Sequence, residues 1–236
     1  MNKVLVTGAT RGIGKAIFTE LAEFCDVYPV ARNEELLKSL KSKDYCVCDL
    51  TDSSDVDTLS DFIKKYQFDI IVNNAGEYIY GGIDVMTKEQ INSIYHTNLI
   101  SPVKIISSAV PYMKQNKWGR IVNIGSISGV MGEAYASLYS STKSGLIGLT
   151  KALALELAEY NITVNTINPG WVETELGNDS VEESDFSKDE IIECIPQKRF
   201  VEPKEVAGLV KYLISEDAKG VTGQSINLCA GLSVGI

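Results

Sequence analysis

The chain has 236 residues, of which 44% are hydrophobic and 22% are charged, and its formal net charge at pH 7 is −9. This balance is typical of a globular protein, and the length fits one large α/β domain over residues 1–236. The acidic charge argues against binding to nucleic acids or anionic membranes, because both require basic patches. The N-terminal stretch lacks the layout of a signal peptide, and no segment approaches the ~18 apolar residues of a membrane span. We therefore expect a cytoplasmic protein.

Cysteine and histidine usage argues against disulfide bonds and metal ions. The cysteines are odd in number and irregularly spaced, at Cys25, Cys46, Cys48, Cys194 and Cys229. Cys46 and Cys48 could suggest a metal clip, but His96 is the only histidine and no Cys-x-x-Cys motif occurs. We therefore expect buried thiols and no bound metal.

Seven short apolar runs have the composition and length of β-strands. They cover residues 3–7, 26–31, 45–49, 69–73, 120–125, 162–168 and 225–229. Between them, apolar residues recur with helical spacing, as at Val56, Leu59 and Ile63. This alternation predicts an α/β fold, a doubly wound parallel sheet with helices on both faces, known as the Rossmann fold. Pro29 cannot donate to a central ladder, so we expect a bulge or a strand end there.

A glycine-rich turn with the sequence TGATRGIG, residues 7–14, joins the first strand to the first helix. Without Cβ atoms, Gly8, Gly12 and Gly14 let backbone amides approach a phosphate, and the N-terminus of a helix favours anions. Ligands of open parallel sheets bind beyond the carboxyl ends of the strands, where this turn lies. The turn therefore predicts a site for the pyrophosphate of a dinucleotide.

The end of the second strand predicts which dinucleotide binds. Arg32 stands where NAD enzymes carry an acidic residue, and its guanidinium could clamp a 2′-phosphate, with Arg11 adding a second positive charge. We therefore expect NADP(H), although Arg32 could instead pair with Glu34 or Glu35. Asp49, at the end of the third strand, is placed to accept a hydrogen bond from the adenine amino group.

The sequence Tyr-Ser-Ser-Thr-Lys places Tyr139 and Lys143 one helical turn apart, on the same face of a helix. The ammonium would stabilise the phenolate, so we expect the pKa of the phenol to fall from its usual ~10 towards working pH. Such a pair can protonate a carbonyl oxygen, which is a form of general acid catalysis. Ser126 lies thirteen residues upstream in a Gly-Ser-Ile-Ser-Gly run.

Together these motifs resemble the short-chain dehydrogenase/reductase family over practically the whole chain, and most closely its 3-oxoacyl-[acyl-carrier-protein] reductases. They occur in the family's order and at its spacings: the glycine turn, Asn-Asn-Ala-Gly at 73–76, Ser126, Tyr139 with Lys143, Pro-Gly-Trp-Val-Glu-Thr at 169–174, Ile-Pro-Gln-Lys-Arg-Phe at 195–200, and Thr-Gly-Gln at 222–224.

The resemblance implies a catalytic tetrad of Asn98, Ser126, Tyr139 and Lys143. Tyr139 would donate a proton to the substrate carbonyl, Ser126 would hydrogen-bond to the same oxygen, and Lys143 would hold the nicotinamide ribose. Hydride would come from the nicotinamide. The backbone carbonyl of Asn98 would hold a water of a proton relay. Pro102 supports this role because it lacks the amide hydrogen that would normally bond to that carbonyl, although a simple kink is the alternative.

The resemblance also implies the cofactor contacts and the assembly. Val172 and Thr174 would contact the nicotinamide carboxamide, and residues 74–76 would lie along the adenosine. The full set of expected cofactor residues is Gly8, Thr10, Arg11, Gly12, Ile13, Gly14, Arg32, Asp49, Leu50, Asn74, Ala75, Gly76, Tyr139, Lys143, Pro169, Gly170, Val172 and Thr174. The implied assembly is a homotetramer, or a homodimer, formed through helices that follow Thr87 and Ser137.

The substrate expected from this resemblance is a 3-oxoacyl group, either free as a small molecule or tethered to a carrier protein. Residues 173–193, at the lid position of the family, are rich in acids, with Lys188 the only basic residue. They form either a solvated loop or a lid that disfavours anionic substrates. Lys114, Lys117 and Arg120 could supply the basic patch on which an acidic carrier protein docks.

Two alternatives remain open from the sequence. The first is a dehydrogenase or reductase of a neutral ketone, alcohol or sugar, possibly dependent on NAD. The second is a catalytically silent dinucleotide-binding sensor or scaffold, which the presence of Ser126, Tyr139 and Lys143 disfavours.

Overall fold

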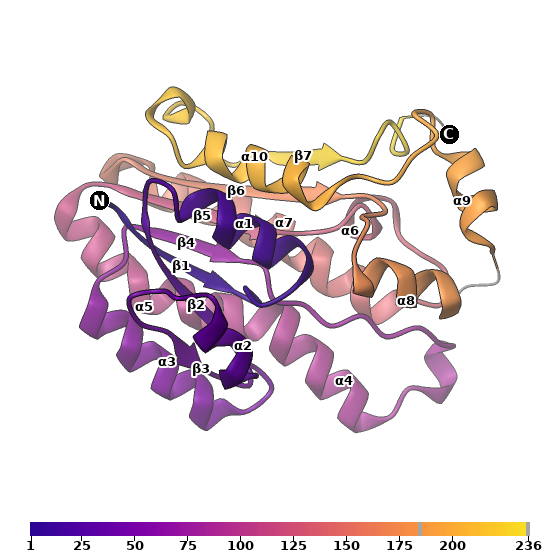
Figure 1. The fold of residues 1–236 in the computed structure, drawn as a ribbon, viewed down its shortest axis with the longest axis horizontal. Coiled ribbons are helices and arrows are strands. Elements are labelled where there is room, and N and C mark those ends of the chain that lie inside the picture. The colour runs from indigo at the N-terminus through magenta and orange to yellow at the C-terminus, as the bar shows by residue number, and fades with distance from the viewer. Residues whose placement is uncertain (184–185, 235–236) are drawn as a thin grey trace.

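A computed structural model describes residues 1–183 and 186–234 of the chain. Its centre is one parallel sheet of seven strands in the order β3-β2-β1-β4-β5-β6-β7 (Figure 1). The strands are β1 Lys3–Thr7, β2 Asp26–Ala31, β3 Cys46–Val47, β4 Ile70–Asn73, β5 Gly119–Ile124, β6 Ile162–Pro169 and β7 Ser225–Leu228. The predicted doubly wound α/β sheet is confirmed.

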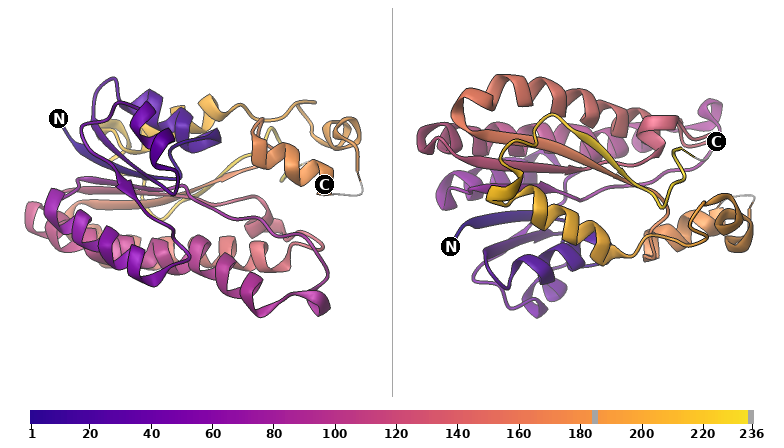
Figure 2. Two further views of the ribbon diagram at one scale, coloured as in Figure 1. Left: turned by 60° about the horizontal axis from the view of Figure 1, so that its bottom comes forward. Right: turned by 90° about the horizontal axis from the view of Figure 1, so that it is seen from above.

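Helices cover both faces of the sheet (Figure 2). The α-helices are α1 Gly12–Leu21, α2 Glu34–Ser39, α3 Ser53–Tyr66, α4 Lys88–Tyr95, α5 Ser101–Asn116, α6 Ser128–Met131, α7 Ser137–Leu157, α8 Glu175–Glu183, α9 Lys188–Cys194 and α10 Pro203–Leu213. Among the described residues, none of these helices is long and apolar enough to span a membrane.

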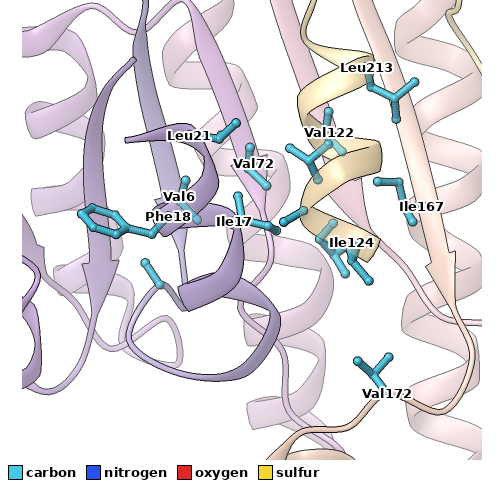
Figure 3. Packing of buried hydrophobic residues seen from close by; sticks show 14 of the residues in the cluster. Val6, Ile17, Phe18, Leu21, Val72, Val122, Ile124, Ile167, Val172 and Leu213 are labelled. Carbon is cyan, nitrogen blue, oxygen red and sulfur yellow. The ribbon is translucent and has the colours of Figure 1, made fainter. Parts of the chain in front are cut away.

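Each face of the sheet has its own hydrophobic core. On one face, α1 and α10 pack over the strands, with Ile17, Phe18, Leu21 and Leu213 among the buried side chains (Figure 3). On the other face, α3, α5 and α7 supply Leu59, Ile63, Ile105 and Leu157, among others. The strands contribute to both cores because successive side chains point to opposite faces. Two cores on one sheet hold the carboxyl ends of the strands in fixed positions.

Pro29 lies inside β2, so the expected bulge or strand end is wrong. The carbonyls of Val30 and Ala31 accept hydrogen bonds from opposite neighbours, Gly8 N–H at 2.8 Å and Cys48 N–H at 3.0 Å. The nitrogen of Pro29 therefore faces β3, whose pairing with β2 begins only at Val30. Proline is tolerated at this position because no ladder hydrogen bond is required there.

The helix that carries Asn98 changes its winding before Pro102. Residues His96–Ile100 form a π-helical turn, in which the N–H of Ser101 donates to the carbonyl of His96, and α5 continues from there. Pro102 lies in the first turn of α5. A local π turn is one way in which a helix absorbs a residue that cannot donate to the regular ladder. Asn98 is thereby buried between α4 and α5.

Candidate active site

A cleft of about 1100 Å³ lies at the carboxyl ends of the strands, beneath α8. Its walls include every residue expected to contact the cofactor, together with Ser126. A volume of this size suits a cofactor with a substrate beside it. Asn98 is the one predicted site residue that does not line the cleft, and it lies directly behind the wall at Gly76.

The glycine turn passes too close to its neighbours to carry side chains. A Cβ on Gly14 would lie 2.1 Å from the carbonyl oxygen of Gly8, and one on Gly8 would lie 2.9 Å from Cα of Ala75. Gly8 and Gly12 also have positive φ angles of 65° and 50°. No side chain caps the N-terminus of α1, so its first amides point into the cleft without a side-chain partner. This arrangement suits a pyrophosphate.

At the adenosine end of the cleft, Arg32 is exposed and makes no ion pair within the described part of the chain. The competing partners considered for it, Glu34 and Glu35, pair instead with Lys38 at 3.1 and 3.8 Å. Arg11 is not free in the same way, because Glu175 accepts from its guanidinium at 3.4 Å.

Asp49 also lines the adenosine end of the cleft. One of its carboxylate oxygens accepts hydrogen bonds from the amide and hydroxyl of Thr51, both at 2.9 Å. The cap of α3 is provided by Asp52, whose side chain accepts from the amides of Ser54 and Asp55. Asp49 therefore does not cap the helix.

Tyr139 and Lys143 come from the first turns of α7 and face the same part of the cleft. The Nζ atom of Lys143 lies 5.5 Å from the centre of the Tyr139 ring and donates to the carbonyl of Ile124 at 2.9 Å. Burial lowers the pKa of Lys143 to about 8. Burial also raises the pKa of Tyr139 to about 12. The direction for Tyr139 is opposite to the one expected from the neighbouring ammonium, because desolvation of the phenolate outweighs the other influences.

A chain of hydroxyl groups leads from Ser126 to a carboxylate that the sequence analysis missed. Ser126 donates to the hydroxyl of Ser128 at 3.1 Å, and Ser128 donates to Oε2 of Glu133 at 2.6 Å. Tyr78 donates to Oε1 of the same glutamate at 2.7 Å. The ring of Tyr78 packs edge-on against Tyr139, with ring centres 5.0 Å apart. Ser128 could have been noticed in the Gly-Ser-Ile-Ser-Gly run, whereas nothing in the sequence pattern marks Glu133 or Tyr78.

Asn98 fixes the segment that follows β4. Its side-chain oxygen accepts from the N–H of Glu77 at 2.8 Å, and its side-chain amide donates to the carbonyl of Glu77 at 2.8 Å and to Thr142 at 3.2 Å. The side chain thus joins the Asn-Asn-Ala-Gly segment to α7. None of these bonds uses the backbone carbonyl of Asn98. That carbonyl has no i+4 donor, because the residue at that position is Pro102, which lacks an amide hydrogen.

The proposed docking patch for a carrier protein is wrong. Arg120 is fully buried, where its guanidinium stacks on Trp118 and lies 3.4 Å from Glu216. Lys114 pairs with Glu156 at 3.5 Å. Arg120 also lies near the amino end of β5, whereas Ser126 and the cleft follow its carboxyl end. These basic residues therefore face away from the cleft.

The cysteine and acidic side chains that the structure describes form no metal site. All five cysteines are free, and Cys194 alone is exposed. Burial raises the pKa of Cys46 to about 11 and that of Cys48 to about 12. Within residues 1–183 and 186–234, no group of three or more His, Cys, Asp or Glu side chains is arranged to hold a metal ion.

The fold and the cleft together define a class of protein. A glycine turn suited to a phosphate, at a helix N-terminus, lies beside a hydroxyl, a phenol and an ammonium. These are the groups that a dinucleotide-dependent oxidoreductase acting on alcohol and carbonyl groups requires. A model of the short chain dehydrogenase family matches residues 2–185, and the chain belongs to that family.

Known relatives cover nearly the whole chain. The chain is 37% identical to the 3-oxoacyl-[acyl-carrier-protein] reductase FabG of Staphylococcus epidermidis, over 98% of this chain and 99% of that protein. It is 34% identical to the 3-oxoacyl-[acyl-carrier-protein] reductase MabA of Mycobacterium tuberculosis, over 98% and 93% of the two chains. A crystal structure of a variant actinorhodin polyketide ketoreductase with NADPH is 36% identical, covers 99% of this chain and 97% of its own, and has a TM-score of 0.91.

Proposed function

We propose that the protein is an NADPH-dependent ketoreductase whose substrate is a 3-oxoacyl thioester. The proposal rests on one observation above all: Ser126, Tyr139 and Lys143 line the same cleft as the glycine turn. The likeness to two 3-oxoacyl-[acyl-carrier-protein] reductases supports the substrate class. The unpaired Arg32, together with the NADPH in the related ketoreductase structure, supports NADP(H) as the cofactor.

In the proposed reaction, the glycine turn and Lys143 would hold NADPH, which would supply the hydride for the carbonyl carbon and become NADP⁺. Tyr139 donates its hydroxyl proton to the carbonyl oxygen, so that C=O becomes CH–OH. Ser126 hydrogen-bonds to the same oxygen as negative charge develops on it. Lys143 would hold the nicotinamide ribose, and its charge would stabilise the phenolate that forms when Tyr139 gives up its proton. Water at the carbonyl of Asn98 connects Lys143 to solvent and restores the proton.

Oxidation of NADPH, followed with acetoacetyl thioesters of a carrier-protein pantetheine and of coenzyme A, tests this assignment. We expect turnover of the thioesters, and a loss of about 10² to 10⁴ in rate when Tyr139→Phe removes the proton donor. Absence of turnover with every β-keto thioester would show that the substrate assignment is wrong.

The cofactor assignment has its own test. We expect Arg32→Ala to lower the preference for NADPH over NADH at least tenfold, because a charged contact to the 2′-phosphate is lost. Lys38→Ala, which removes the neighbouring cation that pairs with Glu34, is the matched control. An unchanged preference in the Arg32 variant contradicts the assignment.

Reduction of a free, neutral ketone is the second candidate. Two observations favour it: the basic residues expected to receive a carrier protein face away from the cleft, and the cleft walls carry the aromatic side chains Tyr78, Tyr80, Tyr135, Trp171 and Phe186. Simple ketones, diketones and sugars measured in the same assay rank this candidate against the thioesters.

We also infer a homo-oligomer, in keeping with the family resemblance. Exposed apolar side chains occur on or beside α4, α5 and α7, at Ile91, Ile100, Val103 and Leu155, and Leu155 is 85% exposed. Burial of such a surface against a second copy would remove it from water. Light scattering of the purified protein, and of Leu155→Lys, measures the assembly; a monomeric wild type contradicts the inference.

A further inference from the structure

Glu133 places a carboxylate at the substrate end of the cleft, beside the residues proposed to carry the reaction. The chain turns sharply just before it, where Gly132 has a φ of 81°, and α7 begins four residues later. Glu133 is only partly exposed and lines the cleft. Both of its oxygens accept hydroxyl hydrogen bonds, from Tyr78 at 2.7 Å and from Ser128 at 2.6 Å.

The charge of Glu133 determines which hydroxyl donates and which accepts in the hydrogen bonds that connect Glu133 to Ser126 through Ser128. An ionised carboxylate only accepts hydrogen bonds, so Ser128 must donate to it. The oxygen of Ser128 is then left to accept, and it accepts from Ser126 at 3.1 Å. The backbone N–H of Ser128 donates in turn to the oxygen of Ser126 at 3.1 Å. The Ser126 side chain therefore has two contacts with Ser128, and the direction of the contact between the two hydroxyl groups depends on the charge of Glu133.

The same carboxylate acts on Tyr139. Tyr78, held by Glu133, packs edge-on against the Tyr139 ring. Burial is the largest cause of the raised pKa of Tyr139, the Ser126 hydroxyl lowers that pKa, and the charge of Glu133 raises it. A negative charge opposes the formation of a second negative charge on the phenol.

Four other charged side chains from the surrounding elements have hydrogen-bond or ion-pair partners. Lys143 approaches Tyr139 from α7 itself and is held by the carbonyl of Ile124. Glu77, after β4, accepts from the hydroxyl of Ser93 at 2.6 Å. On the lid side, Glu173 pairs with Lys188 at 2.9 Å, and Glu175 pairs with Arg11. Glu133 is the one carboxylate among these that affects the phenol.

We propose that Glu133 is a positioning residue that keeps Tyr139 in its protonated, proton-donating form and, through Ser128, fixes the oxygen of Ser126, whose proton turns from Ser128 to the carbonyl oxygen when substrate binds, so that this site favours carbonyl reduction over alcohol oxidation. Reduction needs the phenol, which gives its proton to the carbonyl oxygen. Oxidation needs the phenolate, which accepts the proton of the alcohol while hydride passes to NADP⁺. A charge that disfavours the phenolate therefore moves the onset of oxidation to higher pH. The inference rests on the proposed role of Tyr139 in ketone reduction.

Glu133→Gln, Glu133→Asp and Ser128→Ala separate the charge from the hydrogen bonds. Glutamine keeps nearly the same size and loses the charge, aspartate keeps the charge, and Ser128→Ala breaks the link to Ser126 while leaving Glu133 ionised. For each protein, kcat is measured against pH for NADPH-dependent ketone reduction and for NADP⁺-dependent oxidation of the product alcohol. We expect Glu133→Gln to move the alkaline fall of reduction and the rise of oxidation to lower pH by about 0.5 to 1 unit. Glu133→Asp should give the same pH dependence as the wild type in both directions. Ser128→Ala should lower kcat without shifting either pH profile.

A titration of the tyrosinate absorbance, with the matching Tyr139→Phe protein subtracted, follows Tyr139 without any substrate. Its onset should come at lower pH in Glu133→Gln than in the wild type. Because this measurement needs no turnover, it tests the inference separately from the substrate assignment. The proposal would be overturned if the wild type and Glu133→Gln had the same pH profiles of kcat and formed tyrosinate at the same pH, even if the wild type reduces ketones well.

Discussion

At the scale of single residues, the site contains a lysine whose positive charge is disfavoured by burial. Lys143 is buried, and its ammonium has the carbonyl of Ile124 as its hydrogen-bond acceptor rather than a carboxylate. The resulting fall of its pKa to about 8 means that the folded protein holds this proton less tightly than an unfolded chain does. Burial of the Lys143 ammonium therefore costs stability, and the proposed role of Lys143 in catalysis accounts for a lysine at this position.

This cost predicts how stability depends on pH. Between about pH 8 and 10.5, the unfolded chain keeps the Lys143 proton while the folded chain has lost it, so the free energy of unfolding rises with pH. We expect the wild type to gain roughly 3 kcal/mol relative to Lys143→Met across this range. Urea unfolding of both proteins at several pH values measures the difference. A constant difference would show that the lysine proton is not linked to folding.

A second prediction concerns Gly14, the position in the glycine turn where an added Cβ would come closest to another atom. Gly14→Ala places a Cβ 2.1 Å from the carbonyl oxygen of Gly8, so the turn must move. We expect NADPH to bind at least tenfold more weakly, as measured by fluorescence titration, and the protein to lose about 1–3 kcal/mol of stability.

Gly208→Ala in α10 is the matched control, since nothing lies within 4 Å of the added Cβ. It should gain up to about 1 kcal/mol in stability because alanine favours the helix. NADPH affinity should stay unchanged. Equal behaviour of the two variants would contradict the close-packing argument.

Motifs in the sequence were enough to single out residues that the fold brings to one cleft. The glycine turn, Arg32, Ser126, Tyr139 and Lys143 are recognisable from residue type and spacing, and all of them line one cleft. Glu133 could not be predicted in this way, because its role depends on Tyr78, which is far away in the chain. The pKa of Tyr139 could not be predicted either, since burial is a property of the surroundings.

At the scale of elements, helix α8, which lies where the family resemblance places a lid, forms an ion pair with the glycine turn. Glu175, the first residue of α8, lies 3.4 Å from Arg11, and both side chains are mostly exposed. Exposed pairs of this kind contribute at most about 1 kcal/mol to stability. The pair instead occupies a guanidinium that we expect to contact the 2′-phosphate.

Removal of the lid carboxylate should therefore act on the cofactor more than on the fold. We expect Glu175→Gln to change the free energy of unfolding by less than about 1 kcal/mol and to strengthen NADPH binding several-fold. NADH, which has no 2′-phosphate, should bind as before. Asp179→Asn, on the same helix, is the control for a general loss of negative charge. Equal effects on both nucleotides would contradict a contact between Arg11 and the phosphate.

Element boundaries were predictable where the pattern was strong. The bounds expected for β1 and β2 agree with the structure, whereas β3 is shortened from residues 45–49 to Cys46–Val47. The apolar runs mark which segments are strands, but the length of an edge strand depends on how far its neighbour pairs with it. The place of Pro29 inside β2 has the same cause, since the pairing of β2 with its neighbours sets the side of the strand that the proline nitrogen faces.

At the scale of the whole molecule, one sheet connects two cores. Leu213 of α10 belongs to the core on one face and Leu59 of α3 to the core on the other, and both side chains are fully buried. We propose that the chain unfolds as one unit, because loss of either core removes one face of the shared sheet. Leu213→Ala and Leu59→Ala should each cost about 2–5 kcal/mol.

Denaturation followed by far-UV circular dichroism and by tryptophan fluorescence measures this cooperativity. Both probes should give one coincident transition in the wild type and in each variant, shifted to lower urea concentration. Two separated transitions, each sensitive to one of the substitutions, would show that the faces unfold independently.

The succession of strands and helices, the glycine turn between β1 and α1, and the candidate roles of Ser126, Tyr139 and Lys143 all follow from the sequence alone. These are local properties, because hydrophobic period, glycine spacing and residue type are written along the chain. Only the folded chain shows that Arg120 is buried away from the cleft, that Arg32 makes no ion pair with the described residues and that Glu133 accepts hydrogen bonds from Tyr78 and Ser128. Charge interaction and desolvation depend on distance in space, which the order of residues does not specify.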